Sequence, residues 1–178
     1  MEQTETVMPK SHFKLMSAMF AVRDFFAPRS RILDEIDINE GDVILDFGCG
    51  PGGYCIAAAD LVGESGRIIA LDINPAALEH VQSRAEKQNI DVIETMLSNG
   101  GIDLLDTSVN VVFLFDVLHD LKNWAAIVPE IRRVLKPDGV LATHDHHMKE
   151  EDIIGAVTES GLFQYEGITK HAFRFRPI

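Results

Sequence analysis

The sequence has few cysteines, and it lacks long apolar runs. Two cysteines occur among 178 residues, and Cys49 and Cys55 fall in the same glycine-rich stretch, so they form no disulfide framework. We interpret both as reduced, small packing residues, which favours a cytoplasmic protein. No apolar run reaches transmembrane length, and residues 1–5 lack the basic start of a signal peptide, so we expect neither membrane insertion nor secretion.

The sequence also has little positive charge. Sixteen Lys and Arg residues stand against 28 Asp and Glu residues, which gives a formal net charge of -12. An acidic surface repels phosphate backbones and anionic membranes, so we expect no sequence-independent binding of nucleic acid. Hydrophobic residues are 46% of the chain, which is enough for a substantial core, and a chain of this length suits one domain.

The chain divides into an N-terminal segment and one main domain. Apolar residues at spacings of three and four predict a helix over about residues 11–26. This helix could pack on the domain or form a lid over a ligand pocket, because Met and Phe side chains adapt to apolar ligands. We therefore expect a helical cap segment over residues 1–40 and a compact domain over residues 41–178.

Short apolar runs alternate with helical patterns along the main domain. We predict buried strands that start near residues 43, 67, 91, 110 and 140. Helices are expected between them and over about residues 149–160, a turn at residues 137–139, and a C-terminal antiparallel hairpin over residues 163–176. Strands separated by helices imply right-handed crossovers, so the fold class is α/β. The expected architecture is a Rossmann-like, doubly wound sheet of seven mostly parallel strands.

The stretch from Val43 to Tyr54 organises this domain. A buried strand turns sharply through four glycines into a helix, and such a turn lets the backbone approach a ligand. Alone, the G-x-G-x-x-G pattern of residues 48–53 could mark a dinucleotide site, with Asp72 holding a ribose. Asp46 argues against a pyrophosphate and suits a cationic or amine-bearing ligand, and Pro51 removes one N–H from the turn.

Four segments in family order resemble the class I S-adenosylmethionine-dependent methyltransferases. Residues 43–52 look like motif I, residues 71–75 like motif II and residues 110–119 like motif IV. Residues 132–141 resemble the approach to strand five of that family. The resemblance covers about residues 30–178. It implies the cofactor S-adenosyl-L-methionine, the product S-adenosyl-L-homocysteine and the branch that contains quinone-biosynthesis and other small-molecule enzymes.

The resemblance also implies roles for particular residues. The cofactor-binding residues it implies are Asp46, Phe47, Gly48, Cys49, Gly50, Gly52, Asp72, Ile73, Asn99, Asp116 and Val117. Asp46 and the backbone of residues 48–50 would hold the methionine end of the cofactor. Asp72 would accept hydrogen bonds from both ribose hydroxyls. Ile73 would pack beside adenine, and Asn99 would receive its amino group.

Catalytic candidates follow strands four and five. His119 is the first candidate for a general base, because a neutral imidazole accepts a proton near pH 7; it could equally be a hydrogen-bonded loop histidine. Asp116, His144 and His146 are expected near the substrate. A base is needed only if the methyl acceptor still holds its proton, because alignment and exclusion of water supply most of the acceleration.

The sequence 144–147 invites a metal interpretation. Alternation along a continuing strand would put His144 and His146 on one face and Asp145 and His147 on the other. Residues on opposite faces do not easily join one site, so we predict no metal centre.

Three functions remain open. The leading hypothesis is a methyltransferase for a small-molecule acceptor, because the connections after strands four and five are short and carry no platform for a macromolecule. The alternatives are a nicotinamide-dependent oxidoreductase, which Asp46 disfavours, and a non-catalytic binding protein that retains the fold. The sequence predicts no oligomeric state.

Overall fold

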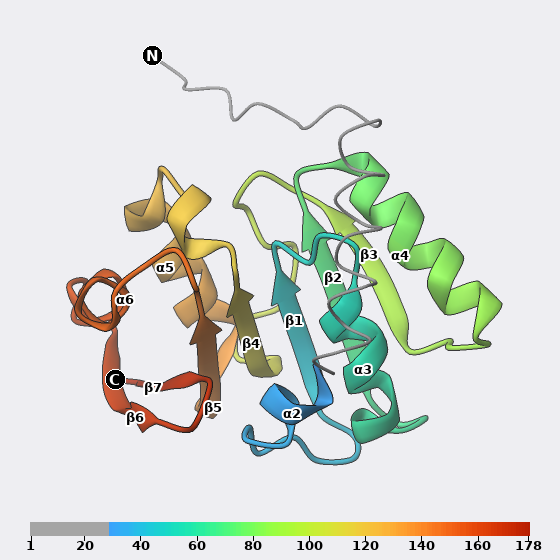
Figure 1. The fold of residues 1–178 in the computed structure, drawn as a ribbon, viewed down its shortest axis with the longest axis horizontal. Coiled ribbons are helices and arrows are strands. Elements are labelled where there is room, and N and C mark those ends of the chain that lie inside the picture. The colour runs from blue at the N-terminus through green and yellow to red at the C-terminus, as the bar shows by residue number, and fades with distance from the viewer. Residues whose placement is uncertain (1–28) are drawn as a thin grey trace.

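A sheet of seven strands runs through the molecule in the order β3-β2-β1-β4-β5-β7-β6 (Figure 1). The structure is a computed structural model, and it describes residues 29–178. The strands are Val43–Phe47 (β1), Arg67–Asp72 (β2), Ile93–Leu97 (β3), Val109–Phe115 (β4), Leu135–His144 (β5), Phe163–Ile168 (β6) and Phe173–Pro177 (β7). The helices are Ser30–Leu33 (α2), Gly53–Val62 (α3), Pro75–Lys87 (α4), Trp124–Val134 (α5) and Glu150–Thr158 (α6), with a 3-10 turn η1 at Leu118–Asp120.

The strand pairing confirms the expected fold class. β1 pairs in parallel with β2 and β4, β2 with β3, and β4 with β5. β7 lies antiparallel between β5 and β6, as the C-terminal hairpin requires. The chain crosses from β3 at one edge back to β4 beside β1, so the direction of winding reverses between β1 and β4. In open α/β sheets the ligand crevice lies at this switch point.

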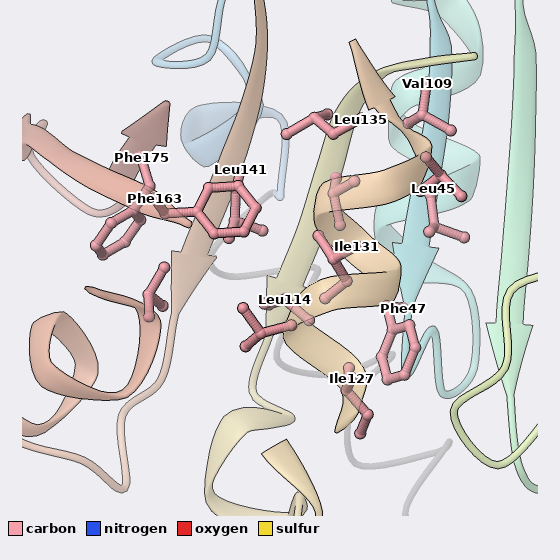
Figure 2. Packing of buried hydrophobic residues seen from close by; sticks show 14 of the residues in the cluster. Leu45, Phe47, Val109, Leu114, Ile127, Ile131, Leu135, Leu141, Phe163 and Phe175 are labelled. Carbon is pink, nitrogen blue, oxygen red and sulfur yellow. The ribbon is translucent and has the colours of Figure 1, made fainter. Parts of the chain in front are cut away.

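Two apolar layers hold the helices against the sheet. Leu45 and Phe47 of β1 pack with Ile127 and Ile131 of α5 on one face, where Figure 2 shows them beside Leu114 of β4. The alternate strand residues form a second cluster with α2, α3 and α4 on the other face. Because successive strand residues point to opposite faces, a strand covered on both sides reads as an unbroken apolar run.

α4 begins as its sequence predicts. The Asn74 side chain accepts a hydrogen bond from the Ala76 N–H at 3.0 Å, and Pro75 occupies the first helical position. Both residues suit a helix start, because the cap satisfies an orphan N–H and proline has no N–H to lose.

Two predicted boundaries are wrong. The expected turn at residues 137–139 lies inside β5, because Leu135 already pairs with Val109 while Val140 pairs with Val111. Residues 136–139 therefore oppose Asn110 alone, and this bulge absorbs the Pro-Asp-Gly sequence. β3 begins two residues later than expected, because Ile93 is the residue that pairs with Ile68 of β2.

The helix predicted over residues 11–26, and with it most of the expected cap segment, lies outside the described residues.

A side-chain hydrogen bond joins α5 to α6. The Trp124 indole N–H donates to the Ala156 carbonyl. This bond ties the start of α5 to α6. Among the described residues, no helix combines the length and apolar character needed to cross a membrane.

Candidate active site at the carboxyl edge of the sheet

A cavity of about 510 Å³ opens where β1, β2 and β4 end. Its walls come from the β1–α3 turn, the end of β2, residues 98–100, and the chain between β4 and α5. The predicted cofactor residues that line it are Asp46, Phe47, Gly48, Cys49, Gly50, Asp72, Ile73, Asn99, Asp116 and Val117. The cavity volume falls within the range of roughly 300–1,000 Å³ that ligand sites occupy.

The β1–α3 turn is fixed by the neighbouring strand. Gly48 and Cys49 donate their N–H groups to the Leu71 carbonyl at 2.8 and 2.9 Å. Gly50 lines the cavity at a φ of 51°, and a Cβ placed on it would meet no atom within 4 Å. The backbone there leaves open space that a side chain would fill, so a ligand can approach it closely.

Gly52 has a different task. It is absent from the cavity wall and has a φ of 72°, and a Cβ on it would lie 2.5 Å from Cγ2 of Val81. Val81 belongs to α4, so this glycine lets the turn pack closely on that helix. The resemblance implies a cofactor contact at Gly52, and the structure shows a packing role for the same residue.

Asp46 is a buried carboxylate in the cavity wall. Burial raises the pKa of Asp46 to about 6, while the Cys55 thiol and the Arg29 guanidinium act in the opposite direction. The thiol donates to Asp46 Oδ2 at 3.0 Å. A carboxylate kept short of compensating partners favours a cationic ligand, which would restore the charge balance.

Asp72 ends β2 and organises two loops at once. Its carboxylate accepts the Gly50 N–H and the Asn74 N–H, both at 2.8 Å. Burial raises the pKa of Asp72, although these backbone hydrogen bonds oppose the shift. Each carboxylate oxygen retains acceptor capacity beyond one bond, so Asp72 can still accept from ligand hydroxyls.

Two residues of the cavity wall escaped the sequence analysis. The Tyr54 ring lies 4.4 Å from the Phe115 ring, centroid to centroid, and the Arg29 guanidinium carbon lies 4.2 Å from the Tyr54 centroid. Arg29 stands far from the motifs in sequence, and Tyr54 had the pattern of an ordinary helix residue. An aromatic residue directly after a glycine turn was the one available signal.

The end of β4 holds the predicted catalytic carboxylate in an unusual conformation. Asp116 lines the cavity, and its φ of 53° is rare for a residue other than glycine. Its N–H donates to the His144 carbonyl at 2.7 Å, and its Oδ1 lies 2.6 Å from His146 Nδ1. Strained backbone of this kind concentrates at functional sites.

The structure places none of the predicted histidines in the cavity wall. His119, His144 and His146 do not line the cavity, although Asp120, Leu121 and Lys122 beside His119 do. His144 Nδ1 contacts the His171 carbonyl at 2.8 Å, on the side of the C-terminal hairpin. The structure therefore separates His144 from the other two histidines.

The alternation predicted for residues 144–147 is wrong, because β5 ends at His144. Beyond that point the chain turns, so the His146 and His147 rings lie side by side at 3.9 Å between centroids. The His147 ring is also 4.4 Å from that of His119. Within residues 29–178, no group of three or more His, Cys, Asp or Glu side chains is arranged to hold a metal ion.

Comparison with known proteins decides the family. Residues 38–172 match the family described as "Methyltransferase domain", which is most of the chain. The chain belongs to the class I S-adenosylmethionine-dependent methyltransferases. A methyltransferase crystal structure from Aquifex aeolicus has the same fold, with a TM-score of 0.81 and 22% identity over 96% of this chain and 98% of that one.

Two curated relatives of this methyltransferase carry functional names. Demethylmenaquinone methyltransferase of Lactobacillus johnsonii is 30% identical over 72% of this chain and 53% of its own length. Aklanonic acid methyltransferase DauC of Streptomyces sp. is 31% identical over 62% of this chain and 54% of its own length. The chain spans about half the length of these relatives.

The cavity of this methyltransferase fits the family's cofactor, S-adenosylmethionine. The cofactor has an ammonium group, a ribose diol and a sulfonium. Asp46 and Asp72 are buried carboxylates in its wall, which could hold a cation and accept from hydroxyl groups. Gly50 leaves the open space that a closely approaching ligand needs.

Proposed function

We propose that this methyltransferase transfers a methyl group from S-adenosylmethionine to a small-molecule acceptor that binds beside Asp116. The observation that carries the proposal is the pair of buried carboxylates, Asp46 and Asp72, in the wall of one cavity at the switch point of the sheet. The names of the relatives, a demethylmenaquinone and an aklanonic acid methyltransferase, support an acceptor of small-molecule size.

Each end of the cavity has a proposed task. Asp46 would hold the ammonium group and the glycine turn would cradle the methionine chain. Asp72 would accept from the ribose, Ile73 would pack beside adenine, and Asn99 would accept from the adenine amino group. Asp116 and Val117 would then border the reacting methyl group. All of these residues line the one cavity, which supports the assignment.

The chemistry asks the protein for alignment more than for activation. The sulfonium supplies an electrophilic methyl group when the cofactor is bound, and the protein residues bind and orient both reactants. Apolar wall residues such as Phe47, Leu121 and Ile127 would exclude water from the reacting pair. Proximity and alignment of this kind contribute effective molarities on the order of 10⁵–10⁸ M in favourable cases.

The experiment that tests this function has two stages. Calorimetry on the full chain with S-adenosylhomocysteine and with NADH separates a methyltransferase from an oxidoreductase that uses the same glycine turn. A screen of small quinols, phenols and amines, with release of S-adenosylhomocysteine as the readout, then tests for transfer. Binding of NADH alone would overturn the proposal. Tight cofactor binding without transfer to any acceptor would favour the non-catalytic alternative.

A further inference from the structure

The His119 ring is held by a carboxylate from the neighbouring strand end. The ring atom Nδ1 of His119 lies 2.8 Å from Asp145 Oδ2, and the backbone N–H of His119 donates to the same oxygen at 3.1 Å. The other oxygen of Asp145 accepts the His147 N–H at 3.0 Å. The Asp145 side chain has no solvent exposure. Asp145 is therefore a buried acceptor surrounded by donors from both of the loops that end β4 and β5.

This arrangement selects one tautomer of His119. An ionised carboxylate offers no proton, so the contact with Nδ1 is favourable only when Nδ1 carries the hydrogen. In the neutral ring the lone pair then belongs to Nε2. A carboxylate that fixes a histidine in this way both orients the ring and stabilises the imidazolium that forms when the ring takes a proton.

The Nε2 atom of His119 lies close to Asp120, a residue that lines the cavity. It is 3.5 Å from Asp120 Oδ2, and Asp120 lines the cavity together with Leu121 and Lys122. The Asp120 side chain is 80% exposed, so solvent screens its charge far more than that of Asp145. The neighbours of the His119 ring that can carry charge are thus Asp145 and Asp120, with the His147 ring 4.4 Å away.

A second pair continues the network toward the cavity. His147 stacks on His146, and His146 Nδ1 contacts Asp116 Oδ1 at 2.6 Å. Asp116 faces the cavity, while the His146 side chain is 53% exposed. The positive φ of Asp116 is uncommon outside glycine, which indicates that its position is enforced by its surroundings.

We infer that His119 Nε2 receives the proton of the methyl acceptor and that Asp145 is the positioning residue that keeps the hydrogen of the neutral ring on Nδ1. The inference rests on the proposed function and narrows its substrate. The acceptor must be one whose nucleophile still carries hydrogen at neutral pH, such as a phenolic or quinol hydroxyl, an amine or an acidic C–H.

The step balances with the groups present. The acceptor atom forms a bond to the methyl carbon while the carbon–sulfur bond breaks, and the bonding pair stays on sulfur as a neutral thioether. The acceptor hydrogen leaves as a proton to Nε2 and creates an imidazolium between Asp145 and Asp120. Release of that proton to solvent returns the neutral ring.

The tautomer can be measured without any acceptor. Long-range ¹⁵N–¹H NMR of the full chain, labelled at histidine nitrogens, should find the hydrogen of His119 on Nδ1. Asp145→Asn replaces one of the two acceptor oxygens with an NH₂ group, so a population with hydrogen on Nε2 should appear. Asp120→Asn is the matched control and should leave the tautomer unchanged. An Nε2–H tautomer in the unmodified protein would overturn the inference.

Turnover provides the second readout. With a hydroxyl acceptor found in the screen, His119→Ala and Asp145→Asn should each lower kcat by about 10²-fold or more, the usual range for general base catalysis. Affinity for S-adenosylhomocysteine should stay within about twofold, because neither residue is among those proposed to hold the cofactor. With a thiol acceptor assayed at alkaline pH, where the thiol is already ionised, both variants should lose far less turnover.

The outcomes separate the two proposals. If the unmodified protein binds S-adenosylhomocysteine but transfers no methyl group, the proposed function fails. If it transfers and His119→Ala keeps its rate on hydroxyl acceptors, only the inference about His119 fails. Retained cofactor affinity reports that each variant is folded, so a loss of turnover in a folded variant supports the inference.

Discussion

The Cys55 thiol donates to the carboxylate of Asp46 across 3.0 Å, and both groups are buried. A hydrogen bond with the Cys49 thiol, followed by burial, raises the pKa of Cys55 well above its usual value, so the thiol keeps its hydrogen and acts as the donor. Cys55 packs in the core, as the sequence predicted, and it also supports the carboxylate proposed to grip the cofactor.

Cofactor affinity should depend on pH through Asp46. The pKa of this carboxyl is raised to about 6 by burial, so the carboxylate becomes protonated as pH falls below that value. Calorimetric affinity for S-adenosylhomocysteine should therefore decline below about pH 6, by up to about tenfold per pH unit. Asp46→Asn should bind weakly and nearly independently of pH. An unchanged pH slope in that variant would assign the effect to Asp72, the other carboxylate whose charge acts on Asp46.

Because of the same raised pKa, replacing Asp46 with asparagine should stabilise the ligand-free protein. The pKa of Asp46 is about 6 in the folded protein, against an ordinary value of 3.8. Ionising this carboxyl therefore destabilises the fold, and the loss of unfolding free energy grows as pH rises from 3.8 to about 6. Asp46→Asn removes the cost and keeps an oxygen for the Cys55 thiol. Its unfolding free energy should exceed that of the unmodified protein by up to about 3 kcal/mol above pH 6 and by little below pH 4. Exposed Asp60→Asn, measured by urea unfolding alongside, should show no such difference.

Two glycines of one turn should respond differently to alanine. Gly52→Ala forces a Cβ against Val81 and a left-handed residue into place, so the unfolding free energy should fall by about 2–4 kcal/mol. Gly50→Ala meets no atom and should cost about 1–2 kcal/mol of conformational strain, yet it should sharply weaken binding of S-adenosylhomocysteine. Val81→Ala should recover part of the loss in Gly52→Ala and none of the loss in Gly50→Ala.

Removing the carboxylate of Asp72 should weaken binding of the cofactor. Asp72→Ala deletes the acceptor of two backbone N–H groups and the proposed acceptor for the ribose hydroxyls. We expect a loss of about 1–3 kcal/mol in the binding free energy of S-adenosylhomocysteine, measured by calorimetry. Asp60→Ala, an exposed residue of α3, is the control. Equal affinity in both variants would remove Asp72 from the binding site.

The C-terminal hairpin should depend on Glu35 for stability. Its carboxylate accepts from the Thr169 hydroxyl at 2.6 Å and the His171 N–H at 2.9 Å, and its other oxygen lies 2.6 Å from His171 Nδ1. Burial alone would raise the pKa of Glu35, but these hydrogen bonds outweigh it and hold the pKa below its usual value. The stabilisation should be full above the unfolded value of 4.5 and lost as pH falls through the lowered folded value.

Glu35→Gln should therefore lower the unfolding free energy by about 1–3 kcal/mol at neutral pH and by progressively less in acid. Urea unfolding across a pH series measures this, with the exposed Glu86→Gln as the control. A constant difference at every pH would mean that the carboxylate charge is irrelevant to the contact.

The parts of the fold predicted from sequence are those in which local pattern and burial agree. β1 and β4 read as apolar runs because both faces are covered, and Asn74-Pro75 carries the start of α4 in two adjacent residues. The expected turn at residues 137–139 was wrong because pairing of Leu135 with Val109 overrides local turn preference.

The candidate site was predictable only where its residues sit in motifs. Asp46 near the end of β1 and Asp72 at the end of β2 lie at strand boundaries, which the apolar runs before them locate. The hydrogen bond from Cys55 and the contact between His119 and Asp145 join residues whose sequence separation carries no periodic signal. The ring of His147 next to that of His119 depends on where β5 ends, which a strand pattern does not fix.

The bond from Trp124 to the Ala156 carbonyl has a practical consequence. The chain contains a single tryptophan, so fluorescence excited selectively at the indole reports on one place in the molecule. That place is the junction of α5 with α6, two residues beyond the cavity-lining Lys122. Any rearrangement of the chain around Lys122 when a ligand fills the cavity would alter the polarity around this indole. Tryptophan fluorescence would therefore report ligand binding without an added label.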